Sequence, residues 1–423
     1  MFELKRILGF IMFAGLLLMS CEPEHAAVAP VSTDTPKQEE PQKPAEEPPV
    51  ISPAMTSIPS VHINTPGKKG VQSKTEWVEL ATIAIKDDKG QMLYQDDSLK
   101  IRGRGNSTWW YAKKPYNIKL DHKADLIGTG KSKKWVLLAN WMDRTLLRNE
   151  IALEAARRTS IDWNPKGRFV KLYLDDNYLG VYWLGEKIEV EESRIKADLL
   201  LSFDNSDQTE FDFFSNGTYQ ANLGQWGAPV EVKFPDRDDY KENVFAEIIG
   251  NAGRVVDSIT DDIAAGDLSK LDVDSFCDWY LIHELCFNLE PNHPKSCFFH
   301  WRDGKMYAGP VWDFDWYTFI PDQNWLGIKN SMWFGTLLKN ASFRNRLKER
   351  WTELKPSFVT LPYYVDNQAE HIREVEAVNH EMWPCESSGV NGDETLSFQE
   401  AVDRLKLALT QRIDYLDKVI PAL

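Results

Sequence analysis

The chain has 423 residues, of which 43% are hydrophobic and 27% are charged. This is the composition of an ordinary globular protein, with room for one large domain or two smaller ones. Lys and Arg together number 49 and Asp and Glu 64, which gives a net charge of −15. A protein this acidic is not expected to bind nucleic acid nonspecifically, and we expect no nucleic-acid partner.

The first 21 residues have the pattern of an export signal. Lys5 and Arg6 precede an apolar run of 13 residues, Ile7–Met19, which is too short to span a membrane. The segment ends in the letters LMSC, and a small residue before Cys21 with a leucine three positions earlier resembles a bacterial lipobox. Cys21 would then be the lipidated N-terminus. A cleaved soluble secretory signal and an uncleaved anchor are the alternatives.

Residues 22–57 are predicted to be a disordered tether rich in Pro and Glu. Its first part, 22–50, contains seven prolines and seven acids but only two lysines, a composition that cannot bury a core. Together with the signal, this predicts an exported protein held to a membrane only through its N-terminal lipid. Glu22 and Glu24 follow Cys21 directly, and we expect them to favour sorting to the outer membrane or cell surface.

The folded part is predicted to begin near Ile58 and to form a single α+β domain over 58–423, β-rich first and mainly helical afterwards. Apolar runs predict strands at 61–64, 78–85, 99–102, 118–120, 135–140 and 230–234. Hairpins are predicted at 169–184 and 298–311. Helices are predicted from Asp143 and over 244–259, 276–288, 343–354, 365–378 and 397–419.

Four cysteines lie outside the export signal, namely Cys277, Cys286, Cys297 and Cys385. None forms a CxxC pair, so a zinc site is not expected. The sequence leaves any disulfide pairing open. Buried free thiols are the expected state.

The stretch from Ile101 to Leu120, IRGRGNSTWWYAKKPYNIKL, is predicted to be a strand, a turn and a strand. Glycines let backbone N–H groups approach a phosphate closely, and arginines neutralise its charge. A lysine on the strand that follows is a common way to hold a nucleotide. A plain turn remains the alternative, because Gly, Asn and Ser are also ordinary turn residues. The residues of interest are Arg102, Gly103, Arg104, Gly105, Asn106, Ser107, Lys114 and Lys119.

A second informative segment reads WDFDW and spans Trp312 to Trp316. In an extended strand, Asp313 and Asp315 would point to the same side. Two neighbouring acids repel unless a cation lies between them, so the pair predicts a Mg²⁺ site in the presence of phosphate. A solvent-facing strand end is the alternative, although the flanking aromatic residues argue against full exposure.

A third candidate is Glu290, which follows the most apolar predicted helix and opens a polar loop. A carboxylate in such a place could orient a hydroxyl group and accept its proton. Helix capping or loop solvation is the alternative. No HExxH or GxSxG motif is present, so a zinc protease or serine hydrolase is not supported. The many Trp and acidic residues leave a glycoside hydrolase open on composition alone.

In combination and order, four blocks resemble the CotH kinase family, named after the spore coat protein H. They are the glycine block at 102–120, WVLLANWMDRTLLRNEIALEAARR at 135–158, VKLYLDDNYLGVYWLGE at 170–186, and 276–315, which ends in GPVWDFD. The segment 333–351 is similar too. The resemblance covers the chain from about Ile58 to near its C-terminus.

The resemblance implies a divergent, atypical protein-kinase-like fold that holds ATP and Mg²⁺ in a cleft and phosphorylates Ser/Thr-type hydroxyls on a protein. By that resemblance, Gly103 to Thr108 would cover the phosphates and Lys114 or Lys119 would contact them, with Glu186 also at the nucleotide. Asp313 and Asp315 would hold the metal. Glu290 and Asp313 would be the catalytic residues.

The chain departs from the family pattern at two positions. The family usually has an aspartate where this chain has Glu290, and a glycine soon after the second metal-binding aspartate, where this chain continues Trp316-Tyr317. A longer acid displaces the carboxylate by about 1 Å, which can cost on the order of 10²-fold in rate. These departures motivate the alternative of a catalytically degenerate, kinase-like surface module that binds a protein or glycan. The acceptor, the partner and the oligomeric state are left open.

Overall fold

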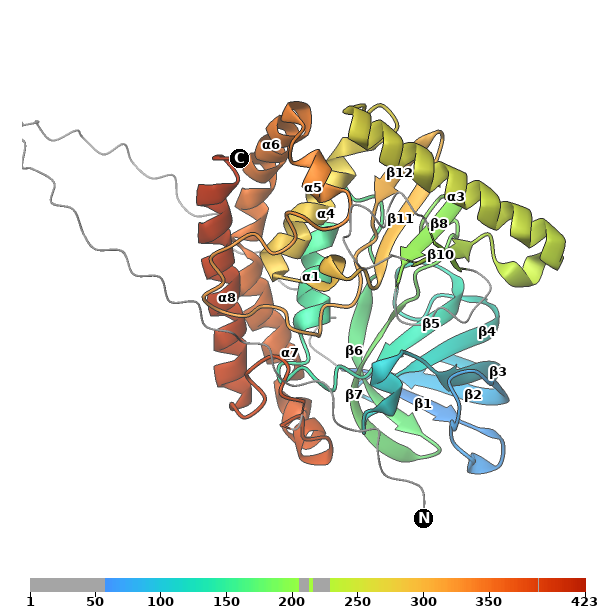
Figure 1. Ribbon diagram of the computed structural model, residues 1–423. Coiled ribbons are helices and arrows are strands. Elements are labelled where there is room, and N and C mark those ends of the chain that lie inside the picture. The colour runs from blue at the N-terminus through green and yellow to red at the C-terminus, as the bar shows by residue number, and fades with distance from the viewer. Residues whose placement is uncertain (1–57, 205–212, 216–228, 387) are drawn as a thin grey trace, which may run out of the picture. The chain divides into compact units, whose positions relative to one another are not determined.

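The computed structural model describes residues 58–204, 213–215, 229–386 and 388–423. Strands dominate the first half of this part of the chain and helices the second half (Figure 1). The predicted α+β class is therefore confirmed. The predicted export signal, Cys21 and the tether at 22–57 lie outside the described residues.

Seven strands of the first half close into a barrel, a closure that the sequence did not predict (Figure 1). The order around the barrel is β1-β2-β3-β4-β5-β7-β6, and the ring closes because β1 pairs with β6 in parallel. Every other pair is antiparallel. The strands are β1 Ser60–Asn64, β2 Val78–Lys86, β3 Met92–Gly103, β4 Tyr116–Ala124, β5 Ser132–Leu138, β6 Gly167–Leu174 and β7 Asn177–Glu186.

Alternating apolar side chains fill the barrel interior. In β4, Ile118 and Leu120 are buried, whereas Lys119 between them is only half-buried. The register places Ile118 beside Ile101 of β3 and Trp135 of β5, which are both buried. Burial of each large apolar side chain is worth roughly 1.5–3 kcal/mol, and this fixes which face of every strand points inward.

A second, five-stranded sheet has the order β12-β11-β8-β10-β9. Its hairpin of β11 and β12 turns at Asp303-Gly304, within the range 298–311 where the sequence predicted a hairpin. The inner strand β8 is buried along its whole length. The strands are β8 Leu199–Phe203, β9 Phe213–Ser215, β10 Pro229–Phe234, β11 Cys297–Arg302 and β12 Lys305–Ala308.

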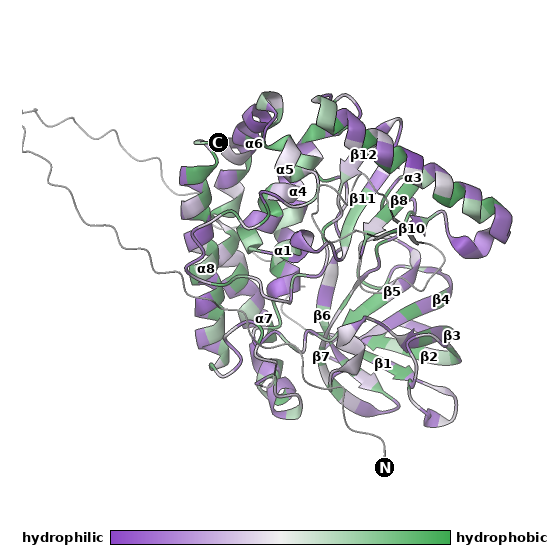
Figure 2. Cartoon of the chain, viewed as in Figure 1, coloured by the Kyte–Doolittle hydropathy of each residue, from purple (hydrophilic) through white to green (hydrophobic). Residues whose placement is uncertain are grey.

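The helices pack mainly around α4, whose residues are nearly all buried. This helix contacts α1, α6 and α8 and ends three residues before the 3₁₀ turn Glu290–Asn292, called the Glu290 turn below. The long helix α3 has hydrophobic and hydrophilic residues alternating along it, as expected for a helix with one exposed face (Figure 2). The helices are α1 Arg148–Arg157, α3 Glu242–Ala265, α4 Val273–Cys286, α5 Phe334–Leu337, α6 Ala341–Phe358, α7 Leu361–Met382 and α8 Phe398–Val419.

Two predicted boundaries between β5 and α1 were wrong. The strand ends at Leu138, before the positive φ of 48° at Asn140, and the helix begins at Arg148 instead of Asp143. The cause is the side chain of Asp143, which accepts a hydrogen bond from the backbone N–H of Arg148 at 2.8 Å. Asp143 therefore holds the irregular turn before the helix and does not form its first turn.

All four cysteines named above are buried free thiols, as the sequence predicted. Among the described residues, no helix has both the length and the apolar character needed to cross a membrane.

Candidate functional site

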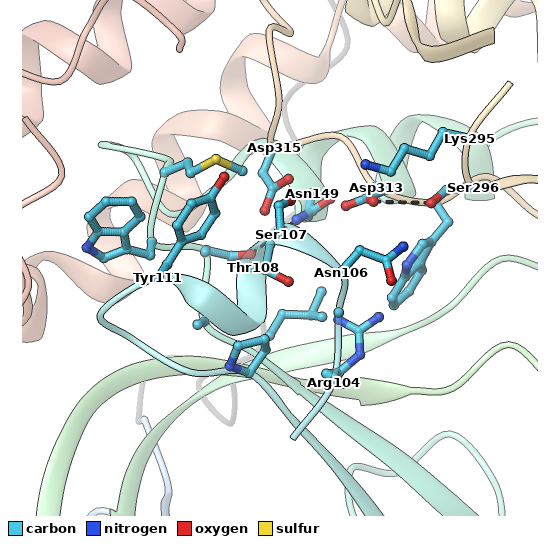
Figure 3. Close-up of a pocket in the computed structure, with 18 of the residues that line it drawn as sticks. Arg104, Asn106, Ser107, Thr108, Tyr111, Asn149, Lys295, Ser296, Asp313 and Asp315 are labelled. Atoms are coloured by element: carbon cyan, nitrogen blue, oxygen red, sulfur yellow. Dashed lines mark hydrogen bonds between the residues drawn. The ribbon is translucent and has the colours of Figure 1, made fainter. Parts of the chain in front are cut away.

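A pocket lies between the glycine-containing segment Gly103 to Thr108, at the end of β3, and the loop that carries the acid pair Asp313 and Asp315 (Figure 3). Further walls come from the turn after β5, from α1, and from the loop before β11. The structure thus brings together two segments that are far apart in the sequence. Of the predicted site residues, the pocket is lined by Arg104, Gly105, Asn106, Ser107, Asp313 and Asp315.

The two glycines of this segment are required by close packing. A Cβ atom on Gly103 would lie 2.1 Å from the ring of Trp109. Gly105 has a φ of +85°, and a Cβ atom there would lie 1.9 Å from the hydroxyl oxygen of Thr108. Glycine at both positions lets the chain fold back tightly into the 3₁₀ turn Ser107–Trp110.

The first backbone amides of the segment are already bonded within the protein. Gly103 N–H donates to the carbonyl of Ser73 at 2.8 Å, and Arg104 N–H donates to the carbonyl of Pro115 at 3.1 Å. An anion bound by backbone amides would therefore have to be held by residues from Gly105 onward. Gly103 does not line the pocket, and it affects the segment only through its close packing against the ring of Trp109.

Arg104 brings a positive charge to the pocket. Its guanidinium carbon lies 5.5 Å from the centre of the Trp312 ring, over the ring face. Burial lowers the pKa of this guanidinium, and the nearby Asp313 and Asp315 oppose that shift. The side chain is thus a largely desolvated cation beside two acids.

The acid pair lies in a loop, so the prediction of an extended strand was wrong. Residues 311–315 belong to no strand, and Asp313 has a left-handed φ of 69°. Between the acids, Phe314 is fully buried, with its ring 5.1 Å from that of His283. Both carboxylates nevertheless face the pocket, because the chain turns around the buried Phe314 (Figure 3).

Three asparagines fix the backbone of this loop. The side-chain oxygen of Asn149, on α1, accepts a hydrogen bond from the N–H of Phe314 at 2.7 Å. Asn288 donates to the carbonyl of the first aspartate at 3.3 Å, and Asn391 donates to the carbonyl of the second at 2.9 Å. The acid pair is therefore held by three separate parts of the chain.

A buried ion cluster lies behind the acid pair. Arg148 is fully buried and pairs with Asp143 and with Asp393, which comes from the segment between α7 and α8. Its Nε also donates to the carbonyl of Thr318 at 3.3 Å. Arg148 thus links α1, the acid-pair loop and the C-terminal helices through one side chain.

The two carboxylates differ in their surroundings. Asp313 is half-buried and accepts a hydrogen bond from the hydroxyl of Ser296 at 3.1 Å (Figure 3). Burial raises the pKa of Asp315, and repulsion from Asp313 and Asp143 adds to the rise. A divalent cation at the pair would relieve this repulsion.

Glu290 is buried just behind the pocket but does not line it. Its Oε2 has no hydrogen-bond partner among the described residues. Burial raises its pKa well above the usual value, and repulsion from Asp313 adds to this. Burial and the neighbouring acids thus disfavour the charged carboxylate, which is the form that acts as a base, and the charge of Lys295 opposes this shift.

Arg102 and Lys114 point away from the pocket. Arg102 donates to the carbonyl of Thr75 at 3.2 Å and lies over the ring of Trp77 at 4.4 Å. Lys114 donates to the carbonyl of Trp109 at 2.7 Å. Neither lines the pocket, so both side chains hold the glycine-containing segment from outside.

Lys119 and Glu186 also lie outside the pocket lining. Lys119 is on the outer face of the barrel, because its neighbours in β4 fill the interior. Glu186 ends β7, and its carboxylate accepts a hydrogen bond from the backbone N–H of Lys166 at 2.9 Å. Burial raises the pKa of Glu186.

Sequence reasoning missed Lys113, which does line the pocket. Its ammonium is fully buried and donates to the carbonyls of Ala139 and Val181 and, at 2.9 Å, to the side chain of Asn379 on α7. This lysine joins the barrel to a C-terminal helix. Asn149 and Lys295 were missed as well, although Asn149 belongs to a block with strong family resemblance.

The residues present fit a magnesium ion only in part. Across the described residues, no three His, Cys, Asp or Glu side chains are grouped closely enough to hold a metal. Mg²⁺ is usually bound through one or two carboxylates, with water and substrate phosphates completing its shell. Asp313 and Asp315 satisfy that requirement.

The family model described as CotH kinase protein matches residues 101–416. The chain belongs to the CotH kinase protein family. The matched region contains every pocket-lining residue named above, from Arg104 to Asp315. A search for similar curated proteins finds no match.

Proposed function

We propose that this CotH family member binds a magnesium–ATP complex in the pocket and transfers its terminal phosphoryl group to a Ser/Thr-type hydroxyl of a protein. One observation carries the proposal. The segment Arg104 to Thr108 and the pair Asp313 and Asp315 line the same pocket. Family membership adds support, and we extend it to a kinase-like arrangement of the barrel and the helical half.

The roles of the residues follow from their positions. Asp313 and Asp315 would hold the metal, which neutralises charge on the phosphates when bound. Arg104 would bind phosphate oxygens, and Asn106, Ser107 and Thr108 would cover them from the barrel side. Catalysis of this kind relies on positioning and charge stabilisation, so rigid support of the acid pair matters most.

The proposal is tested by phosphotransfer from radiolabelled Mg–ATP to a Ser-rich protein, with Asp313→Asn compared to Asp303→Asn. Asp303 is an exposed acid in the β11–β12 turn and serves as the matched control. We expect label transfer by the wild type and the control but not by Asp313→Asn. Equal transfer by all three proteins, or none by the wild type, would reject catalysis.

The second candidate is a surface module that binds a protein or glycan without turnover. Glu290 favours it, because the family usually has an aspartate at this place and because the buried Oε2 of this side chain has no hydrogen-bond partner among the described residues. Thermal-shift measurements separate the two candidates, since a ligand that binds only the folded state raises the melting temperature. A shift with glycan and none with Mg–ATP would support the binding module.

We further propose that the protein is exported and anchored at the outer membrane or cell surface by a lipid on Cys21. The pattern of the first 21 residues supports this. Metabolic labelling with a fatty acid should mark the wild type and not Cys21→Ser. Protease treatment of intact cells should then digest the wild type, and full protection would count against exposure at the surface.

A further inference from the structure

Lys295 lies in the loop between the Glu290 turn and β11, and its side chain lines the pocket. Figure 3 shows the ammonium directed toward the side of the pocket where Asp313 lies. This ammonium makes no hydrogen bond or ion pair with any described residue. The pocket therefore contains a cation that the described part of the protein does not neutralise by direct contact.

The other pocket lysines differ from Lys295 in this respect. The ammonium of Lys113 is held by backbone and side-chain oxygens, and that of Lys233 pairs with Glu231. Among the pocket-lining residues, only the guanidinium of Arg104 resembles Lys295, since it also makes no hydrogen bond or ion pair with the described residues. Arg104 and Lys295 come from opposite sides of the acid pair (Figure 3).

Charge counting indicates what such a pocket would bind. When ionised, Asp313 and Asp315 cancel one divalent cation, so the cations Arg104 and Lys295 outnumber Asp204, the other acid that lines the pocket. Unpaired cations in a half-buried site favour a ligand that brings several anionic oxygens. A monophosphate bound through the metal satisfies one of these cations, whereas a longer polyphosphate reaches both.

We propose that Lys295 is a phosphate-binding residue and that, with Arg104, it makes the pocket select polyphosphates over monophosphates. The proposal rests on the proposed function, because it assigns a new residue and a ligand preference to the same pocket. Lys295 lines the pocket and its ammonium is directed toward Asp313 (Figure 3), so it is close to where a metal-bound phosphate would lie.

The test measures dissociation constants by calorimetry for Mg²⁺ complexes of ATP, ADP, AMP and inorganic tripolyphosphate. The proteins are the wild type, Lys295→Met, Lys295→Arg and the control Lys305→Met, which removes an exposed lysine of β12. A hydrogen bond between charged groups predicts that Lys295→Met weakens ATP and tripolyphosphate roughly tenfold or more. AMP binding should change little, and Lys295→Arg should restore most of the loss.

The outcomes separate this proposal from the proposed function. Equal affinities of the wild type and Lys295→Met for ATP and tripolyphosphate overturn the role of Lys295 and leave nucleotide binding intact. Binding of tripolyphosphate but not ATP, with loss in Lys295→Met, overturns the nucleotide and supports Lys295. No binding of any phosphate compound by the wild type overturns both. A uniform loss for AMP and ATP alike overturns the selectivity.

Discussion

The side-chain oxygen of Asn149 accepts a hydrogen bond from the backbone N–H of Phe314, which separates the two pocket aspartates. The residues are 165 positions apart in the chain, and Asn149 is on α1 whereas Phe314 is in a loop of the helical half. The bond ties the acid pair to the helix that follows the barrel strand β5. The position of each aspartate therefore depends on a neutral side chain that supplies no charge to a ligand.

We expect Asn149→Ala to weaken Mg–ATP binding and to lower stability by about 1–3 kcal/mol, because the buried N–H of Phe314 loses its acceptor. Calorimetry and urea denaturation measure the two effects. Asn251→Ala, an exposed change on α3, is the control and should alter neither. Unchanged binding in Asn149→Ala would show that the loop keeps its shape without this bond.

Substitution of two glycines tests how tightly the glycine-containing segment packs at Gly105. Gly105 and Gly304 have similar positive φ values of +85° and +76°, but only at Gly105 would a Cβ atom meet a close neighbour. Gly304→Ala should cost about 1–2 kcal/mol from backbone strain alone. Gly105→Ala should cost more and also reduce the thermal shift with Mg–ATP. Equal losses in both variants would argue against tight packing onto Thr108.

The buried ion cluster predicts a large loss of stability in Arg148→Ala. Removal of this side chain leaves Asp143 and Asp393 buried without their counter-charge, which should cost about 3–5 kcal/mol. Chemical denaturation measures the change, with the exposed Arg254→Ala as control. A loss below about 1 kcal/mol would mean that the two acids become protonated or hydrated at little cost.

His283 predicts how stability depends on pH. Burial lowers its pKa to about 3, so the folded protein keeps it neutral, while the unfolded chain becomes protonated below the ordinary histidine pKa of 6.5. The resulting stability is complete above pH 6.5 and is lost as the pH falls toward 3. Between pH 7 and 5 this residue should cost about 2 kcal/mol.

Urea denaturation of wild type and His283→Gln at both pH values isolates that contribution. The variant should lose less stability on acidification, because it cannot take up the proton when unfolded. His122→Gln changes an exposed histidine and should behave as the wild type does. The same slope in all three proteins would exclude His283 as the source.

Much of the fold could be predicted, because the local spacing of apolar and polar residues indicates which side chains are buried. Three elements were predicted to within a few residues. They are β4, from its alternating apolar residues, the β11–β12 hairpin, from the turn residues Asp303-Gly304, and α4, from its long apolar run. The boundary at Asp143 could not be predicted, since its carboxylate bonds a backbone amide five residues ahead. A hydrogen bond of this kind leaves no periodic pattern of apolar residues in the sequence from which it could be predicted.

The site was predictable in its parts but not in its assembly. Sequence chemistry selected Arg104, Asp313 and Asp315, which all line the pocket. It also selected Lys119, which faces outward because a one-residue step along a strand reverses the direction of the side chain. Lys295 was missed because a single lysine in a loop has no local feature that sets it apart.

The sequence by itself determined the class of the chain, the family blocks and the residue types that suit phosphate and magnesium, because these depend on composition and local spacing. Tertiary structure alone decided that the barrel closes and that the chain carrying Asp313 and Asp315 turns around the buried Phe314. It also decided that Arg104 and Lys295 line the same pocket as these two acids. Those outcomes depend on contacts between distant segments, whose strength is set by burial and charge in three dimensions.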